Sequence, residues 1–166
     1  NYIKSNINYL YDFQNVPELL FLSENEMFKD SDGNIINIEV RGERNHAKCY
    51  FKVKDVMIGF NMSSLEKNIK DVKSAYIINE DYIIFNIVNS RNSEVSKYMF
   101  LTYCGLLRAL FASHSKHVKK FQDWATNTLF TIQMGTLQEK NKLISHIKGV
   151  SYENIQELFS INARSL

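Results

Sequence analysis

The order of hydrophobic periodicities along the 166-residue chain constrains its fold more than any other feature. Apolar and polar residues alternate over 36–41 and 48–53, the pattern of half-buried strands. Three further strands are predicted at 75–78, 82–88 and 98–101. From residue 102 onward apolar side chains recur every three or four residues, as in amphipathic helices. Strands first and helices later predict an α+β fold, in which a small antiparallel sheet with hairpins packs with a helical half and C-terminal helices are appended.

Local signals place turns and helix starts within this plan. Asp32-Gly33 lies between apolar pairs, which predicts a tight hairpin. Asp55 is expected to cap or charge-stabilise one short helix, and Ser63 has capping-box spacing to Glu66 in a second. Two short helices at this spacing are compatible with a helix-turn-helix, although the pattern is a common one.

Four helices are expected in the C-terminal half. Thr102 should cap the first, and the others are predicted at about 116–130, 137–148 and 152–160, with Ser151 as the cap of the last.

Composition excludes several classes of protein. Hydrophobic residues make up 45% and charged residues 23% of the chain, as in ordinary globular proteins. No apolar run approaches the roughly 18 residues that a membrane helix needs, so no membrane partner is expected. Cys49 and Cys104 match no disulfide framework, which favours a reducing compartment.

The sequence shows no catalytic constellation. The six glycines are isolated, so no glycine-rich phosphate loop is present. Cys104, His114 and His117 could supply three zinc ligands, but no second pair completes a tetrahedron. We therefore expect no cofactor, no metal and no enzymatic activity from this chain by itself.

Charge is unevenly distributed along a chain whose net charge is only +2. Residues 1–36 are acidic, with two basic side chains against six acidic ones. Residues 37–73 carry eight basic side chains against five acidic ones, and residues 101–135 carry four against one. Two basic blocks of this kind can attract nucleic-acid phosphates through charge and counterion release.

Within these blocks we single out candidate DNA contacts. The first-rank candidates are on or just before one helix, and they are Lys116, Lys119, Lys120 and Arg108. The second-rank candidates come from the other basic block and from a polar turn, and they are Lys52, Lys54, Lys67, Lys70 and Arg91. The alternative is a solvated helix face in which Lys119 pairs with Asp123 at i,i+4.

Four stretches of the chain are similar to one viral family. They are Cys49–Val56, Phe100–Arg108, the Phe121-Gln122-Asp123-Trp124 sequence and Leu129–Gly135. Together they resemble the Bro-N/KilA-N group of DNA-binding domains of large DNA viruses and phages, above all the subgroup of entomopoxviruses, iridoviruses and giant viruses. The resemblance runs from about Glu26 to Gly135, and residues 149–162 resemble the linker helix that follows this domain.

The resemblance implies more about fold than about contacts. Most of its apolar positions are expected in the core, Trp124 included, and Gly105 is expected to allow a close packing contact inside a helix. Phe130, Gln133 and His114 stand where many members have Pro, Arg and Arg. Each lost arginine removes a possible phosphate contact.

Three functions follow as hypotheses. The first is a non-catalytic viral domain that binds duplex DNA, with RNA as a further possibility, in viral replication or transcription regulation. The second is a protein-interaction module that forms a homodimer. The third is the targeting half of a nuclease whose catalytic domain follows residue 166. The expected parts are an acidic arm (1–25), a Bro-N-like domain (26–135) and a helical extension (136–166), in the cytoplasm or nucleus of a host cell.

Overall fold

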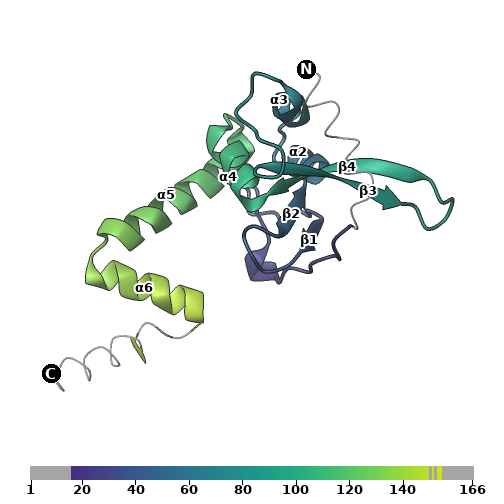
Figure 1. Cartoon of the computed structure of the whole chain (residues 1–166). Helices are drawn as coiled ribbons and strands as arrows, with labels where there is room; N and C mark the ends of the chain where they lie inside the picture. The colour runs from purple at the N-terminus through teal and green to yellow at the C-terminus, as the bar shows by residue number, and fades with distance from the viewer. Residues whose placement is uncertain (1–15, 150, 152, 155–166) are drawn as a thin grey trace. The chain divides into compact units, whose positions relative to one another are not determined.

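The computed structural model describes residues 16–149, 151, 153 and 154. Its elements, shown in Figure 1, are η1 (Glu24–Glu26), β1 (Val40–Gly42), β2 (Cys49–Lys52), α2 (Val53–Gly59), α3 (Leu65–Lys70), β3 (Tyr82–Val88), β4 (Val95–Thr102), α4 (Tyr103–Ala112), η2 (Lys116–Val118), α5 (Lys119–Met134) and α6 (Leu137–Lys148). The chain divides into two compact units, residues 1–121 and 122–166, with the boundary inside α5. The α+β class predicted from the sequence is confirmed.

The first unit is built on a four-stranded antiparallel sheet in the order β1-β2-β4-β3. Phe51 pairs with Val40 on one side and with Leu101 on the other, so β2 and β4 form the centre. The segment before η1 continues the sheet beyond β1, since the Leu20 amide donates to the Val40 carbonyl at 2.8 Å. This contact covers the β1 edge, which would otherwise leave backbone groups without partners.

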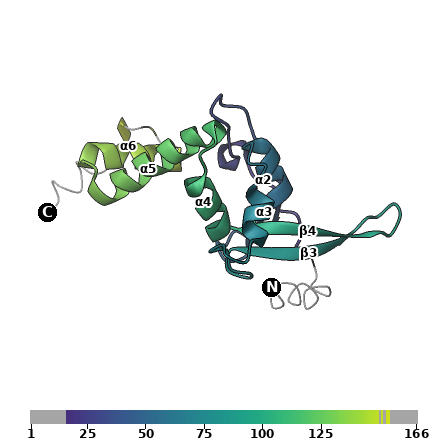
Figure 2. The same cartoon turned by 90° about the horizontal axis from the view of Figure 1, so that it is seen from above.

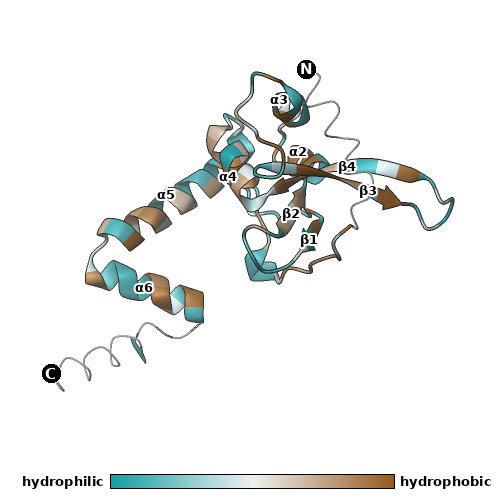
Figure 3. Ribbon diagram, in the orientation of Figure 1, coloured by the Kyte–Doolittle hydropathy of each residue, from teal (hydrophilic) through white to brown (hydrophobic). Residues whose placement is uncertain are grey.

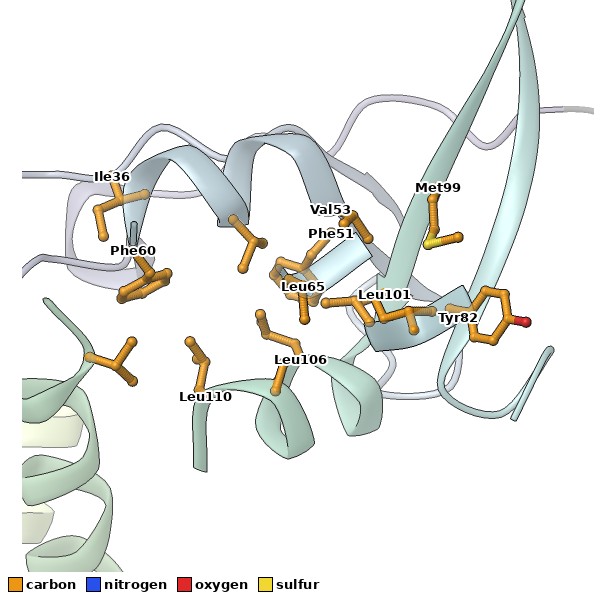
Figure 4. Close-up of a cluster of buried hydrophobic side chains, with 14 of the residues drawn as sticks. Ile36, Phe51, Val53, Phe60, Leu65, Tyr82, Met99, Leu101, Leu106 and Leu110 are labelled. Atoms are coloured by element: carbon orange, nitrogen blue, oxygen red, sulfur yellow. The ribbon is translucent and has the colours of Figure 1, made fainter. Parts of the chain in front are cut away.

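The helices cover one face of the sheet and close the main core. Leu106 and Leu110 on α4 point toward Phe51 on the sheet and Phe60 after α2 (Figure 4). Leu106, Leu110 and Phe60 are fully buried. Burying each such side chain contributes roughly 1.5–3 kcal/mol, so a few of them fix α4 on the sheet. The opposite face carries a smaller cluster, Ile83, Phe85 and Phe100.

The turn that ends at Asp81, just before β3, is hydrogen-bonded to the start of α4 and to Arg108 on that helix. The buried Asp81 carboxylate accepts hydrogen bonds from the Ile77 amide at 2.8 Å and from Arg108 Nε at 3.3 Å. The Thr102 amide donates to the Asp81 carbonyl at 2.9 Å, while Thr102 Oγ1 accepts from the Gly105 amide at 3.1 Å. Thr102 therefore caps α4 as predicted, and the turn and the helix start are bonded together.

Several local expectations differ from the structure. The segment 75–78 is no strand, because Asp81 folds it into a turn that leaves only the isolated Ile78–Tyr82 bridge. Asp55 is not the cap of α2, since its carboxylate accepts the Glu39 amide at 2.8 Å, but it lies in the first turn, where a negative charge stabilises the helix start as the alternative prediction stated. The N-cap of α3 is Ser64 rather than the predicted Ser63, and its side chain makes no capping hydrogen bond. The predicted helix at 152–160 lies almost wholly outside the described residues.

The second unit contains the rest of α5 and all of α6. Thr136 forms a capping box with Glu139, and Gly149 ends α6 with a φ of 64°. Hydrophobic and hydrophilic residues alternate along both helices (Figure 3). Trp124, predicted as core, is 58% exposed, and Leu129, Ile132 and Leu137 are exposed as well. Within the described part of the chain, no helix combines the length and the apolar character that crossing a membrane requires.

Candidate nucleic-acid interface

A groove of about 490 Å³ separates α3 from the segment that joins α4 to α5. We call it the interhelical groove. Its surface is about equally polar and apolar, and its apolar lining residues are Met62, Leu65, Ala109 and Ala112. Its polar lining residues are Asn61, Ser63, Ser64, Asn68, Tyr76, Ser113, His114, Ser115, Lys116 and His117. Amide, hydroxyl and ammonium groups are the ones that contact phosphates and base edges in protein–DNA complexes.

One wall of the interhelical groove is the turn between α2 and α3. Asn61 adopts a φ of 52°, a left-handed conformation that asparagine tolerates better than most residues. The Met62 amide then donates to the Met57 carbonyl at 2.8 Å, which closes the turn. Leu65 and Ile69 are buried one helical turn apart and anchor α3. Asn68, which is exposed, is thereby held along the groove.

The other wall is the segment from Ser113 through η2. Ser115 Oγ donates to the Phe60 carbonyl at 2.7 Å, a contact that joins the two walls across 55 residues of sequence. The same oxygen accepts the His117 amide at 3.3 Å and so caps η2. Val118 is fully buried. With the backbone fixed at these points, Lys116 is held exposed at the rim.

The turn at residues 30–34 supports the lysine segment from beside the groove. Ser31 Oγ donates to the Lys116 carbonyl at 2.6 Å, and Lys120 Nζ lies 3.7 Å from where a Cβ on Gly33 would be. The Asp30 carboxylate accepts the Asp32 and Asn34 amides, both at 2.9 Å. These bonds, the Asn34 amide foremost, hold the pKa of Asp30 below its ordinary value. The Asp30 carboxylate therefore stabilises the turn at residues 30–34.

Three of the first-rank candidates lie together. All three are exposed: Lys116 is the first residue of η2, and Lys119 and Lys120 are the first two residues of α5. Arg108 instead donates from Nε to the buried Asp81 carboxylate, which raises the pKa of Arg108 above its ordinary value. We therefore give Arg108 a structural role in attaching α4 to the Asp81 turn.

Lys52 is also engaged within the fold. Its Nζ lies 2.7 Å from Glu39 Oε2 and 4.4 Å from the centroid of the Tyr98 ring, and its side chain is only 16% exposed. Burial raises the pKa of Glu39, but hydrogen bonds from Lys52 and Arg41 outweigh it and bring that pKa below its ordinary value. This arrangement stabilises the sheet and turns the ammonium group away from solvent.

The remaining second-rank candidates belong to three different parts of the fold. Lys54 is exposed on α2, and Lys67 and Lys70 are exposed on α3. Lys70 Nζ lies 2.5 Å from Glu66 Oε1, an i,i+4 pair on the helix surface. Arg91 is at the tip of the β3–β4 hairpin. The nine predicted residues therefore come from several elements, and Lys52 and Arg108 are engaged in ion pairs within the fold.

Sequence reasoning missed the neutral residues of the interhelical groove. Asn61, Ser63 and Asn68 are uncharged, so the charge distribution did not indicate them. The turn after Gly59 was noted only as a helix-turn-helix spacing. The Ser115–Phe60 contact that brings the walls together leaves no trace in a local pattern. A serine- and histidine-rich segment between two amphipathic helices was the one signal available.

The described residues provide little other chemistry. No cluster of three His, Cys, Asp or Glu side chains suited to a metal occurs among them. Cys49 and Cys104 are free thiols, and burial raises the pKa of Cys49. Cys104 Sγ lies 3.7 Å from Asp81 Oδ1, whose carboxylate also serves the Asp81 turn.

Comparison with known proteins identifies the class of this domain. A family model described as "BRO family, N-terminal domain" matches residues 39–131, which include both walls of the interhelical groove. The chain belongs to this Bro-N family.

Curated relatives of the chain include viral proteins. The chain is 44% identical over 161 residues to uncharacterized protein L5 of Acanthamoeba polyphaga mimivirus, covering 90% of this chain and 35% of that protein. Uncharacterized protein L12 of the same virus is 36% identical over 157 residues, covering 90% of this chain and 32% of that protein. The chain thus spans about a third of the length of these relatives. No solved structure matches it.

Proposed function

We propose that this Bro-N domain is a non-catalytic module that binds duplex DNA, with the interhelical groove and the adjoining Lys116, Lys119 and Lys120 as its contact surface. The observation that carries the proposal is the juxtaposition itself. Lys116 is part of the groove lining together with exposed amide and hydroxyl side chains, and the exposed Lys119 and Lys120 follow it within four residues. Lysines neutralise phosphates without regard to sequence, while Asn and Ser side chains can position the backbone or contact base edges.

Rigid support of the groove favours this reading. The Ser115–Phe60 and Ser31–Lys116 bonds fix the lysine segment from two sides, and buried Val118 anchors it. A preorganised segment loses little conformational entropy when it binds, so more of the contact energy appears as affinity. An unsupported run of surface lysines would lack this advantage.

The role of the longer viral protein is part of the same proposal. Its Bro-N domain would bring attached domains to viral DNA during replication or transcription, in the cytoplasm or nucleus of the host. Any catalytic step would then belong to another part of the protein. Homodimerisation stays an untested prediction.

The salt dependence of binding tests the proposal. Fluorescence anisotropy with a labelled 20-base-pair duplex should give an affinity that falls linearly on logarithmic axes as salt rises. Three phosphate contacts correspond to a slope of about −3. Duplex RNA of the same sequence should bind more weakly, because side chains cannot read its deep, narrow major groove. A slope near zero, or no affinity at low salt, would contradict DNA binding by these lysines.

A further inference from the structure

The β3–β4 hairpin extends well beyond the rest of the sheet. β2 pairs with β4 only from Lys52–Phe100 to Tyr50–Thr102, whereas β3 and β4 stay paired out to Val88–Val95. The outer part is therefore a two-stranded ribbon, which we call the β-arm and define as residues 86–97. Figures 1 and 2 both show it projecting away from the helices of the first unit.

The β-arm contributes little to the core. Just before the arm, the last packed pair on the helix-covered face is Ile84–Met99, and within the arm Asn86 then faces Lys97. The next pair on that face, Val88 and Val95, is 60% and 59% exposed. On the other face, Ile87 packs against the Ile83, Phe85 and Phe100 cluster, so the arm is packed only at its base. Beyond that base, a two-stranded ribbon is marginally stable by itself in water. Its length therefore points to a role outside the core.

The side chains of the β-arm suit nucleic acid better than protein. Apart from Ile87, Val88 and Val95, all its residues are polar: Asn86, Asn89, Ser90, Arg91, Asn92, Ser93, Glu94, Ser96 and Lys97. Two cationic groups against one carboxylate give the arm a net positive charge. This charge is complementary to phosphate, and a docking surface for another protein would ordinarily be more apolar and aromatic.

The tip is a closed turn with an exposed arginine. The Asn89 amide donates to the Glu94 carbonyl at 2.8 Å, and the Ser93 amide donates to the Asn89 carbonyl at 2.9 Å. The Arg91 amide donates to Asn89 Oδ1 at 2.9 Å. Backbone groups of the tip thus bond within the turn, and the Arg91 side chain is left exposed at its end.

We propose that the β-arm enters the major groove of the duplex. This inference rests on the proposed DNA-binding function and adds a second contact element to it. The major groove, about 12 Å wide, admits a two-stranded ribbon. There Arg91 can bond the O6 and N7 acceptors of guanine, asparagine amides can bond adenine, and the valine pair can contact thymine methyl groups. Lys97 lies farther back on the ribbon, at the level of the phosphates.

Two variants test the β-arm against the interhelical groove. In the first, Arg91→Ala removes the tip cation, and in the second an Asn-Gly turn replaces residues 89–94. Because both changes are at an exposed tip, the fold should persist in each, as thermal melts would confirm. Arg91→Ala should weaken duplex binding about tenfold. Lys48→Ala, which removes an exposed cation outside both surfaces, should change it by less than about twofold.

Dimethyl sulfate footprinting supplies the readout for the groove used. Wild-type protein should protect guanine N7 in the major groove, and the shortened arm should lose that protection while it keeps weaker, salt-dependent binding. Unchanged affinity and unchanged N7 protection in both variants would overturn the β-arm proposal alone. Changes confined to adenine N3, in the minor groove, would overturn the assignment to the major groove. If the wild-type protein has no duplex affinity, the proposed function and the β-arm proposal both fail.

Discussion

Gly105→Ala is expected to destabilise the first unit by about 3 kcal/mol, as an overpacked site does. A Cβ at this position would overlap the Asp81 carbonyl oxygen and come within 2.7 Å of its carbon. This backbone has little room to move, because the same carbonyl accepts the Thr102 amide and the Asp81 carboxylate binds the Ile77 amide. Urea denaturation would measure the change in the free energy of unfolding.

This prediction separates packing from helix propensity. In a helix interior alanine is favoured over glycine by about 1 kcal/mol, so propensity alone predicts that Gly105→Ala stabilises the protein. Gly59→Ala is the matched comparison, since the nearest atoms to a Cβ there belong to the Ile36 side chain rather than to backbone. We expect a smaller loss for Gly59→Ala. A Gly105→Ala protein as stable as the wild type would show that α4 does not approach the Asp81 turn this closely.

Reversing the charge of Lys116 and Lys120 together is expected to lower duplex affinity at least about 100-fold near 0.1 M salt. The slope of log affinity against log salt should flatten by about 2, because two phosphate contacts are lost. Both side chains are exposed, so the fold should be retained. Anisotropy titrations of Lys116→Glu/Lys120→Glu, together with a thermal melt, would measure the two effects.

The control must carry the same change in net charge. Lys48→Glu/Lys73→Glu provides it, because these two lysines are exposed and lie outside the interhelical groove. We expect this pair to reduce affinity only slightly, through the overall field of the protein. Equal losses in the two double variants would mean that DNA responds to net charge alone and that Lys116 and Lys120 form no contact site.

The parts of the fold that depend on neighbouring residues could be predicted from the sequence. β3 and α6 have the predicted bounds, 82–88 and 137–148, and Thr102 caps α4 through its own side chain. These features follow from local periodicity and capping chemistry. The segment 75–78 was predicted wrongly because its apolar residues suggest a strand, whereas the Asp81 carboxylate folds it into a turn.

The candidate site was predictable only in part, because some of its contacts join residues that are distant in the sequence. Lys116, Lys119 and Lys120 are close in sequence, so their grouping follows from helix geometry. The ion pairs of Lys52 with Glu39 and of Arg108 with Asp81 join residues 13 and 27 positions apart, and only the fold shows them. Trp124 fits a helical apolar stripe, but periodicity does not show whether anything packs on that stripe.

Amide hydrogen exchange with and without duplex DNA is the most direct test of the contact surface. We expect slower exchange on both walls of the interhelical groove, over residues 61–68 and 113–120, with α6 unchanged as an internal reference. Protection of these two segments together would locate DNA where the lysines and the groove meet. Protection confined to α6, or identical exchange in both segments under conditions where the duplex is bound, would contradict this expectation.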